Sequence, residues 1–561
     1  VALTLGPALC ATILRIPKPK KHGPLAWFNT GLIWSRKVYV GISMWVAKRT
    51  LLTIGLLIAV IVTSYLMVSS LPKAFIPTED QGVIFSDIKT REGNNLPQTK
   101  AILDKISERV LCVPGVDGVL EVDGFSIIGG RSENVSLMII SLADWDKRTT
   151  PATQVDAIMQ QIKSRTDSIV GAAINLFSPP PIQGLGTAGG LDFRLQALRD
   201  TDPQKLQAVL DKLLQKINQS PEFAYAFSTY SANTPHIFLD INRKKAQSMD
   251  VPIANIFSTL QSYLGMRYVN DINQGSQTKQ VRLQADWRYR KDIEAIKKLY
   301  VVGATGKQVP LGSLVSMRMT LAPCTQSRYN LYPSAEITAQ AAQGYSSGQA
   351  MDKLEQITKE VLPAGYSYEW SGMSYQEKKT GDQIAMLLAL SLMFGYLFLV
   401  AQYESWAIPI PIILSLSVAV LGGLVGLELW HLPMSIYAQL GIIMLVGVAS
   451  KNAILIVEFA KTHREMGHSI MESAAISAHE RYRAVLMTAF TFIVGVLPMV
   501  FATGAGANSR KALGVTIFCG MLAATTLGML KIPALYVPIQ KLREKIKGNK
   551  NVTSEFIKDN V

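Results

Sequence analysis

Lys451 is the residue in this sequence whose position most strongly suggests chemistry. It lies near the middle of the apolar run from Tyr437 to Lys461, YAQLGIIMLVGVASKNAILIVEFAK. A charged group on a central membrane-spanning helix costs at least ~2.5 kcal/mol on insertion scales and usually faces a partner or an aqueous path. Lys451 is therefore a candidate for charge pairing inside a membrane.

Neither nearby acid is placed to neutralise Lys451. Glu458 lies two turns further along the same run, and Glu428 lies at the opposite end of the preceding apolar run. Two interpretations follow. Lys451 either snorkels or bonds to carbonyls and to the hydroxyls of Ser450 and Thr488, or it pairs with a carboxylate on a helix outside this sequence. Protonation of that carboxylate would change its pairing with the lysine and shift helix packing.

The elements that must position this lysine are membrane helices. The chain has 561 residues, of which 48% are hydrophobic, and a positive mean hydropathy, so we expect a membrane protein with a large polar insert. Six apolar runs approach the ~20 residues needed to cross ~30 Å of hydrocarbon. They cover residues 51–70, 384–401, 408–429, 437–461, 484–503 and 512–536. In the third run, Gly422 and Gly426 have the G-x-x-x-G spacing that favours close helix packing.

Positive charge gathers at two places in a chain whose net charge is +15. Residues 15–49 hold eight Lys or Arg and no acid, and residues 541–550 hold five more, which predicts that both segments are cytoplasmic. Trp27, Trp34 and Trp45 accompany the first cluster, as in a helix lying in the membrane interface. Anionic lipid is a simpler partner for this charge than nucleic acid.

The polar insert reads as a repeated α+β unit. Residues 82–177 predict the order strand-helix-strand-strand-helix-strand, and this order restarts at residue 191 and is completed only after residue 336. That order is the split βαβ of a ferredoxin-like fold. We expect two such units, with a small α/β domain inserted in the second. One irregular α/β domain is the alternative.

Several apparent motifs do not carry chemistry. Residues 184–189 match G-x-G-x-x-G, but prolines precede them and a strand follows, so they predict a loop between the repeats. GATGKQ at residues 303–308 lacks P-loop spacing, and the six histidines and four cysteines show no ligand spacing. The sequence therefore predicts no cofactor, metal site or catalytic constellation, and a membrane-anchored enzyme is the weakest interpretation.

Five segments together resemble a known transporter family. They are VASKNAILIVEFAK, AVLMTAFTFIVGVLPMV, ATGAGANSRKALG, SGMSYQEK and AQYESWAIP. They closely resemble the carboxy-terminal half of inner-membrane permeases of the resistance-nodulation-division (RND) family, in its multidrug efflux branch. The resemblance covers essentially the whole chain. It implies a proton-driven antiporter that works as a homotrimer with a periplasmic adaptor and an outer-membrane channel, and that exports amphiphilic molecules from the periplasm and outer leaflet.

The resemblance also implies roles for particular residues. Lys451 would pair with two aspartates on a helix of the amino-terminal half, with Arg481 and Thr488 completing a proton relay. Candidate substrate contacts by resemblance are Phe125, Ile127, Arg131, Ile139 and Phe177. Ile127 and Ile139 stand where the family often has aromatic residues, which puts an aromatic-rich substrate preference in doubt. Core packing is the alternative role for Phe125 and Phe177.

The resemblance completes the expected organisation. It comprises the end of a truncated membrane helix (1–14), a basic interfacial segment (15–49), a membrane helix (50–71), a first ferredoxin-like porter subdomain (72–190), a second one (191–241 and 319–378), an inserted docking subdomain (242–318), five membrane helices (380–540) and a basic cytoplasmic tail (541–561). The large loop would lie in the periplasm. Without the amino-terminal permease half, which would hold the aspartates, we expect no coupled export. A non-transporting remnant and a relative with a different hydrophobic substrate are the alternatives.

Overall fold

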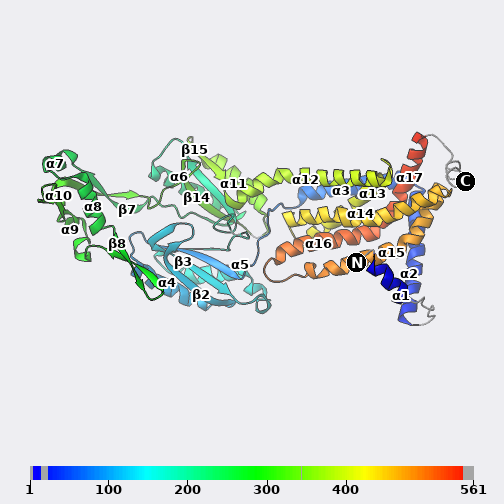
Figure 1. Cartoon of the computed structure of the whole chain (residues 1–561), viewed down its shortest axis with the longest axis horizontal. Coiled ribbons are helices and arrows are strands. Elements are labelled where there is room, and N and C mark those ends of the chain that lie inside the picture. The colour runs from blue at the N-terminus through cyan, green and yellow to red at the C-terminus, as the bar shows by residue number, and fades with distance from the viewer. Residues whose placement is uncertain (1–3, 14–22, 183, 343, 548–561) are drawn as a thin grey trace.

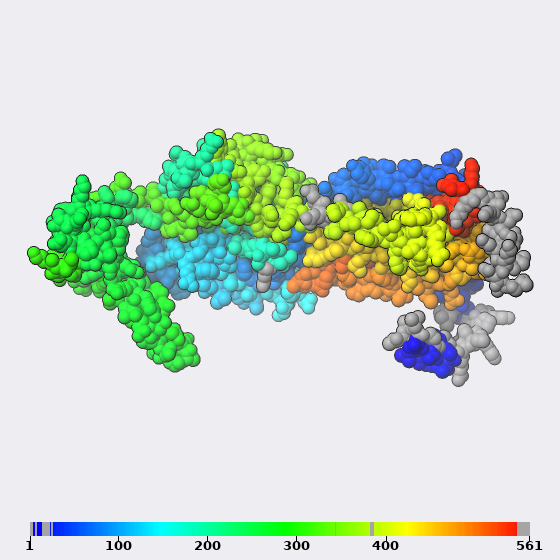
Figure 2. All heavy atoms as spheres, turned by 45° about the horizontal axis from the view of Figure 1, so that its top comes forward, coloured from blue at the N-terminus to red at the C-terminus, as the bar shows by residue number. Residues whose placement is uncertain are grey.

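The computed structural model describes residues 4–13, 23–182, 184–342 and 344–547. Three parts follow one another along the long axis of the molecule: a bundle of long helices, a pair of α/β units, and a small α/β part at the far end (Figure 1). The hairpin of β8 (Arg267–Gln274) and β9 (Gln277–Leu283) consists entirely of exposed residues, and it projects from the far end in the space-filling view (Figure 2).

Six helices in the described part are long and apolar enough to cross a membrane, in agreement with the six predicted spans. The bundle consists of α3 (Thr50–Ser70), α12 (Gly372–Tyr403), α13 (Pro409–Leu429), α14 (Ile436–Glu465), α15 (Ile470–Val500), and α16 (Ala507–Ala523), which continues through a π-helical turn (Ala524–Gly528) into α17 (Met529–Lys547). The helix α12 begins twelve residues before the predicted apolar run, because its first turns pack on the α/β units, where Met373 and Ser374 are buried.

Two shorter helices precede the bundle, α1 (Leu5–Ile13) and α2 (Pro24–Ala47). The helix α2 crosses the end of the bundle away from the α/β units (Figure 1). Tyr39 attaches it, because its ring stacks on Tyr482 at 4.9 Å and its hydroxyl donates to the carbonyl of Met529 at 3.2 Å. Trp27 and Trp34 are exposed, and the interfacial position of this segment stays a prediction. The remaining basic residues of that segment, 15–22, lie outside the described residues.

The helices α13 and α16 approach closely at the G-x-x-x-G pair. A Cβ on Gly422 would lie 2.8 Å from the carbonyl oxygen of Cys519, and one on Gly426 would lie 2.7 Å from the Cβ of Cys519. Backbone and side-chain atoms of α16 therefore fill the space that larger side chains would need.

We expect Gly426→Leu to force these two helices apart and to destabilise the bundle by about 1–3 kcal/mol, the usual cost of overpacking. Thermal unfolding of the purified chain in detergent measures this loss. Gly395→Leu on α12 is the matched control, because nothing lies within 4 Å of a Cβ there. Equal melting temperatures for the two variants would contradict the packing role.

The first α/β unit has the predicted element order. It contains β1 (Val83–Thr90), α4 (Leu96–Leu111), β2 (Val116–Ser126), β3 (Gly130–Leu142), α5 (Val155–Thr166) and β4 (Ala172–Phe177). Its four strands form an antiparallel sheet in the order β2-β3-β1-β4. Alternate residues such as Ile84 and Ile88 face the two helices, where they pack with Leu103 and Ile158.

The second α/β unit is built in the same way. It contains β5 (Leu191–Ala197), α6 (Pro203–Asn218), β6 (Phe223–Phe227), β13 (Ser327–Tyr329), β14 (Tyr332–Ala341), α11 (Ser347–Val361) and β15 (Tyr366–Trp370). The strands form a five-stranded sheet in the order β13-β14-β5-β15, with β6 also paired to β14. On β5, Phe193 and Leu195 enter the core beneath α6 and α11, so Asp192 and Arg194 point to the opposite face.

A two-stranded ribbon leads from the second unit to the small part. It pairs β7 (Thr234–Ile241) with β12 (Val315–Ala322), so β7 lies outside the five-stranded sheet. The small part contains α7 (Arg243–Ser248), α8 (Ile253–Tyr263), β8, β9, α9 (Ile293–Lys297), β10 (Tyr300–Val302), β11 (Gln308–Pro310) and α10 (Leu311–Leu314). Ile256 and Leu311 belong to its own small core.

Each α/β unit is held on the bundle by a different helix. The carboxylate of Glu79, in the segment between α3 and β1, accepts hydrogen bonds from the backbone N–H groups of Asn508 (3.1 Å) and Ser509 (2.7 Å) at the start of α16. In the second unit, the N–H of Asp192 donates to the Oγ of Ser374 (3.0 Å) in the first turn of α12. The two junctions let the helix bundle position both sides of the space between the units.

Candidate functional site

Lys451 lies on a stripe of exposed residues along one side of α14. Leu440, Met444, Gly447, Lys451 and Glu458 are separated by three, four or seven residues, so they share one helix face. Leu440 and Met444 are each 47% exposed. Within the described residues, no carboxylate lies within 4.0 Å of the Lys451 ammonium, and the ion pairs of this helix are elsewhere. The lysine thus points away from the bundle without an acidic partner.

The three residues to which the family resemblance gave a relay role lie on two helices, Lys451 on α14 and Arg481 and Thr488 on α15. The helices α14 and α15 are antiparallel neighbours, and the contact of Phe459 with Arg481 sets their alignment. Thr488 then lies at about the level of Lys451, with its hydroxyl donating to the carbonyl of Val485 at 3.0 Å. Arg481 lies eight residues of α14 away from Lys451, roughly 12 Å along the axis.

Arg481 is engaged by an aromatic ring that sequence reasoning did not identify. Its guanidinium carbon lies 3.3 Å from the centroid of the Phe459 ring, an attractive cation–π geometry. Its Nε is buried and has no hydrogen-bond partner among the described residues. The sequence spacing of Phe459 and Arg481 does not predict this contact, because it depends on how α14 and α15 are aligned.

The predicted substrate contacts fall into two environments. Phe125 and Arg131 are opposite each other where β2 ends and β3 begins, and residues 127–129 form the turn between the two strands. Phe125 is 36% exposed, and Ile127 at the turn is partly exposed. Ile139 is also partly buried on β3.

Phe177 is fully buried between the two α/β units. Its ring makes an edge contact with Phe85 and stacks on Phe227 of the second unit, both at centroid distances of 6.1 Å. This aromatic cluster joins the sheets of the two units, which is the geometry of core packing. A substrate role for Phe177 stays a prediction.

We expect Phe177→Leu to lower the free energy of unfolding by about 1 kcal/mol, because it removes ring contacts from a filled site. Chemical denaturation followed by tryptophan fluorescence would measure the change. Phe125→Leu, at an exposed position, should leave the stability within about 0.5 kcal/mol of the original. If the two variants were equally stable, Phe177 would not have a packing role.

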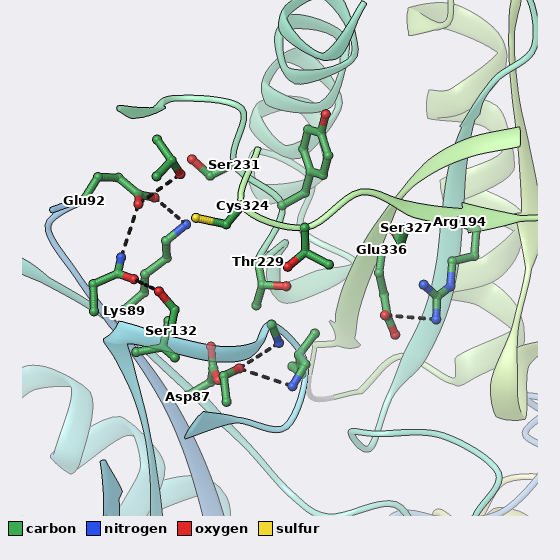
Figure 3. A pocket seen from close by; sticks show the side chains of 18 residues that line it. Asp87, Lys89, Glu92, Ser132, Arg194, Thr229, Ser231, Cys324, Ser327 and Glu336 are labelled. Atoms are coloured by element: carbon green, nitrogen blue, oxygen red, sulfur yellow. Dashed lines mark hydrogen bonds and ion pairs between the residues drawn. The ribbon is translucent and has the colours of Figure 1, made fainter. Parts of the chain in front are cut away.

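A cleft of about 780 Å³, including its open mouth, lies between the two α/β units (Figure 3). Its charged lining residues come from both units: Asp87, Lys89 and Glu92 from the first, and Arg194 and Glu336 from the second. Seven serine and threonine side chains line it as well, and one lining residue is aromatic. The cleft is therefore suited to polar or charged groups more than to flat apolar rings.

The charged residues of the cleft form two ion pairs, and the fifth, an acid, is bonded to a hydroxyl group. Lys89 lies 2.9 Å from Glu92, and Arg194 lies 2.9 Å from Glu336. Burial alone would raise the pKa of Glu92, but bonds from Lys89 and from neighbouring hydroxyls lower it. Asp87 accepts a hydrogen bond from Ser126, and burial raises its pKa. With two cations for three carboxylates, the cleft is slightly acidic.

The comparisons with known proteins identify the family. The family model described as "AcrB/AcrD/AcrF family" matches residues 1–540. The chain belongs to the AcrB/AcrD/AcrF family. The resemblance to RND drug-efflux permeases that the sequence predicted is thereby confirmed.

Curated members of the AcrB/AcrD/AcrF family are similar over nearly the whole chain. The multidrug/solvent efflux pump membrane transporter MepB of Pseudomonas putida is 35% identical over 99% of this chain and 53% of its own length. The multidrug export protein AcrF of Escherichia coli strain K12 is 34% identical over 96% of this chain and 53% of its own. This chain thus spans about half the length of the curated relatives it matches.

Sequence reasoning identified the residues on the membrane helices but not the cleft. Lys89 and Glu92 are near each other in sequence, yet Arg194 and Glu336 are more than 100 residues away from them. One signal was present: β5 alternates apolar residues with Asp192 and Arg194, and so presents a polar face. What that face meets depends on how the units pack.

Proposed function

We propose that this chain forms the carboxy-terminal half of a proton-driven RND permease that exports amphiphilic molecules. The observation that supports this proposal is the position of Lys451. A cation at the centre of a spanning helix needs an acidic partner or an aqueous path, and the exposed stripe of α14 offers Lys451 to a neighbouring helix. That partner comes from outside this sequence, as the amino-terminal permease half.

A second intramembrane lysine makes the contrast clear. Lys531 on α17 is buried, with 8% of its surface exposed, and its ammonium donates to the carbonyl of Leu56 on α3 at 3.3 Å. Lys531 thus finds its hydrogen-bond acceptor within the chain, whereas Lys451 is on the exposed face of α14. In the proposed cycle, two carboxylates of the amino-terminal half bind Lys451, and their protonation releases it and shifts the helices. In this proposal two residues of α15 complete the relay: Thr488 at the level of Lys451, and Arg481 further along α15.

The same proposal assigns a role to each part outside the helix bundle. The two sheets are ferredoxin-like porter subdomains, the cleft between them is part of the substrate path, and the small end part is a docking subdomain. The units lie in the periplasm of a bacterium whose inner membrane holds the helices. Three copies form a homotrimer, which works with a periplasmic adaptor and an outer-membrane channel.

The proposed substrate contacts divide between an apolar and a polar surface. Phe125, Ile127 and Ile139 offer partly exposed apolar side chains, and Arg131 lies beside Phe125. The cleft offers carboxylates and hydroxyl groups instead. A molecule with an apolar body and a cationic head could use both surfaces.

Ethidium export tests the proposal. Cells without their own drug pumps would express this sequence together with the amino-terminal half of such a permease. We expect several-fold lower ethidium accumulation than in cells with either half alone, and a protonophore should remove the difference. Export that survives the protonophore would contradict proton coupling, and equal accumulation in all strains would contradict the transport function.

A further inference from the structure

A buried carboxylate lies directly behind the cleft. Asp192 and Arg194 occupy the same face of β5, and Glu336 is paired with Arg194 across the sheet. Arg194 and Glu336 line the cleft (Figure 3), whereas Asp192 is 2% exposed. Asp192 is therefore buried behind the Arg194–Glu336 ion pair, which lines the cleft.

The three charges do not balance. Two carboxylates share one guanidinium, and Arg194 is engaged by Glu336 at 2.9 Å. One oxygen of Asp192, Oδ1, is buried and has no hydrogen-bond partner among the described residues. A Cβ on Gly186 would lie 2.8 Å from the other oxygen, Oδ2, so the carboxylate is tightly enclosed. An uncompensated charge in such a place is usually neutralised by a proton.

No other charged group among the described residues is placed to compensate Asp192. The charged groups of β5 and β14 that face Asp192 are Arg194 and Glu336, which pair with each other. On β15, Glu369 is opposite Arg194 and accepts from Asn330. On α12, the first acid is Glu377, which accepts from Ser347.

The charged groups of the first unit are engaged as well. Lys89 is paired with Glu92 at 2.9 Å, and Asp87 is bonded to Ser126. Burial raises the pKa of Asp192 to about 7, with a further rise from Glu336 that Arg194 partly offsets. Burial also raises the pKa of Glu336.

We propose that Asp192 is a proton-binding site outside the membrane helices, and that its protonation state sets the charge of the cleft. The second part rests on the proposed function, since it treats the cleft as a substrate path. With the proton bound, Glu336 is the sole carboxylate beside Arg194 and the pair is neutral. Without it, Arg194 is shared between two acids, and the cleft becomes more negative and more attractive to cations.

The same network reaches the membrane helices. The Nε of Arg194 donates to the Oγ of Ser371 at 3.3 Å, and the N–H of Ser371 donates to the carbonyl of Asp192 at 3.1 Å. Ser371 directly precedes α12. The backbone of Asp192 and the side chain of Arg194 are therefore both bonded to the residue from which α12 leaves the second unit.

The first test is the pH dependence of unfolding for the original chain and for Asp192→Asn. Because the folded-state pKa is raised from 3.8 to about 7, the original chain should lose stability as pH rises through this interval. The Asn variant has no charge to bury there. The ratio of their unfolding constants should change by up to about 1,000-fold between pH 4 and pH 8. A ratio that stays constant would overturn the proton site.

Glu336→Gln is a control for structural effects of the Asp192→Asn substitution. Removing the neighbouring negative charge should move the midpoint of the pH dependence of Asp192 to lower pH. An unchanged midpoint would show that the Asp192–Glu336 interaction is absent, and would overturn the proposed link between them.

The second test measures binding of rhodamine 6G, a cationic amphiphile, by fluorescence polarisation at pH 6 and pH 8. We expect several-fold tighter binding at pH 8 for the original chain and no such change for Asp192→Asn. Glu377→Gln, which removes a half-buried acid on α12, should keep the original pH dependence. The same pH dependence in the Asn variant would overturn the link to the cleft. If nothing binds at either pH, the cleft's role as a substrate path fails, and the unfolding experiment still decides the proton site.

Discussion

Replacing Lys451 with methionine should reduce proton-coupled export to the level of cells without a pump. Methionine keeps an unbranched side chain of similar length, so the change removes the charge and little of the shape. If carboxylates of the amino-terminal half alternate between pairing with Lys451 and binding protons, the variant leaves them without a cation in either state. Ethidium accumulation in cells that express both halves is the measurement.

The stability of this variant separates loss of mechanism from loss of folding. Removing a charge from the centre of a spanning helix should favour insertion by roughly 2.5 kcal/mol, and Lys451 has no ion pair within the described residues to lose. We therefore expect a folded yield equal to or above the original. Lys461→Met is the matched control, because Lys461 is near the end of the same helix, 4.0 Å from Glu465. Full export by the Lys451 variant would refute the relay.

Replacing Glu79 with alanine should loosen the first α/β unit from the bundle, at a cost of about 3 kcal/mol. Its carboxylate accepts from two N–H groups at the start of α16 and from the hydroxyl of Ser509 at 2.5 Å. The residue before α16, Gly506, has no side chain to cap the helix. Bonds to a charged acceptor are each worth about 1.5–3 kcal/mol, and an anion at a helix N-terminus adds up to about 2 kcal/mol.

Hydrogen exchange at Asn508 and Ser509 is the direct measurement of this junction. Their amide protons should exchange faster by about 100-fold in the alanine variant, as a loss of about 3 kcal/mol implies for local opening. Glu108→Ala, an exposed acid on α4, should leave them unchanged. Unaltered protection in the Glu79 variant would mean that the junction is held by other contacts, such as the bond from the Asn508 amide to the carbonyl of Thr78 at 2.7 Å.

The junction also matters for export if the proposed function holds. The helix α16 packs against α14 and α15, which carry Lys451, Arg481 and Thr488. A displacement of these helices would reach the first unit through Glu79 and the second through the start of α12. The cleft lies between the two units, so the two junctions provide a physical route from the membrane charges to the substrate path. We therefore expect Glu79→Ala to lower export even where the protein is folded.

Sequence alone determined the elements of this protein. An apolar run near 20 residues long is long enough to cross a bilayer as a helix. The runs at Leu51–Ser70 and Tyr437–Lys461 gave helices close to their predicted bounds. Local residue patterns also predicted the strand-helix order of both repeats, to which β5, α4 and α6 belong. These signals are local, because side chains within a few residues of one another determine which face of an element is apolar. The family was evident from contiguous motifs for the same reason.

Tertiary structure alone decided which of these elements meet. The alignment of α14 with α15 placed Thr488 at the level of Lys451 and Arg481 on Phe459. The packing of two sheets brought the Lys89–Glu92 and Arg194–Glu336 pairs to the same cleft. These contacts join residues up to several hundred positions apart, and no local pattern encodes them. Burial followed from the same packing. It encloses Asp192, a polar residue on the alternating strand β5, and leaves one of its oxygens unpaired among the described residues.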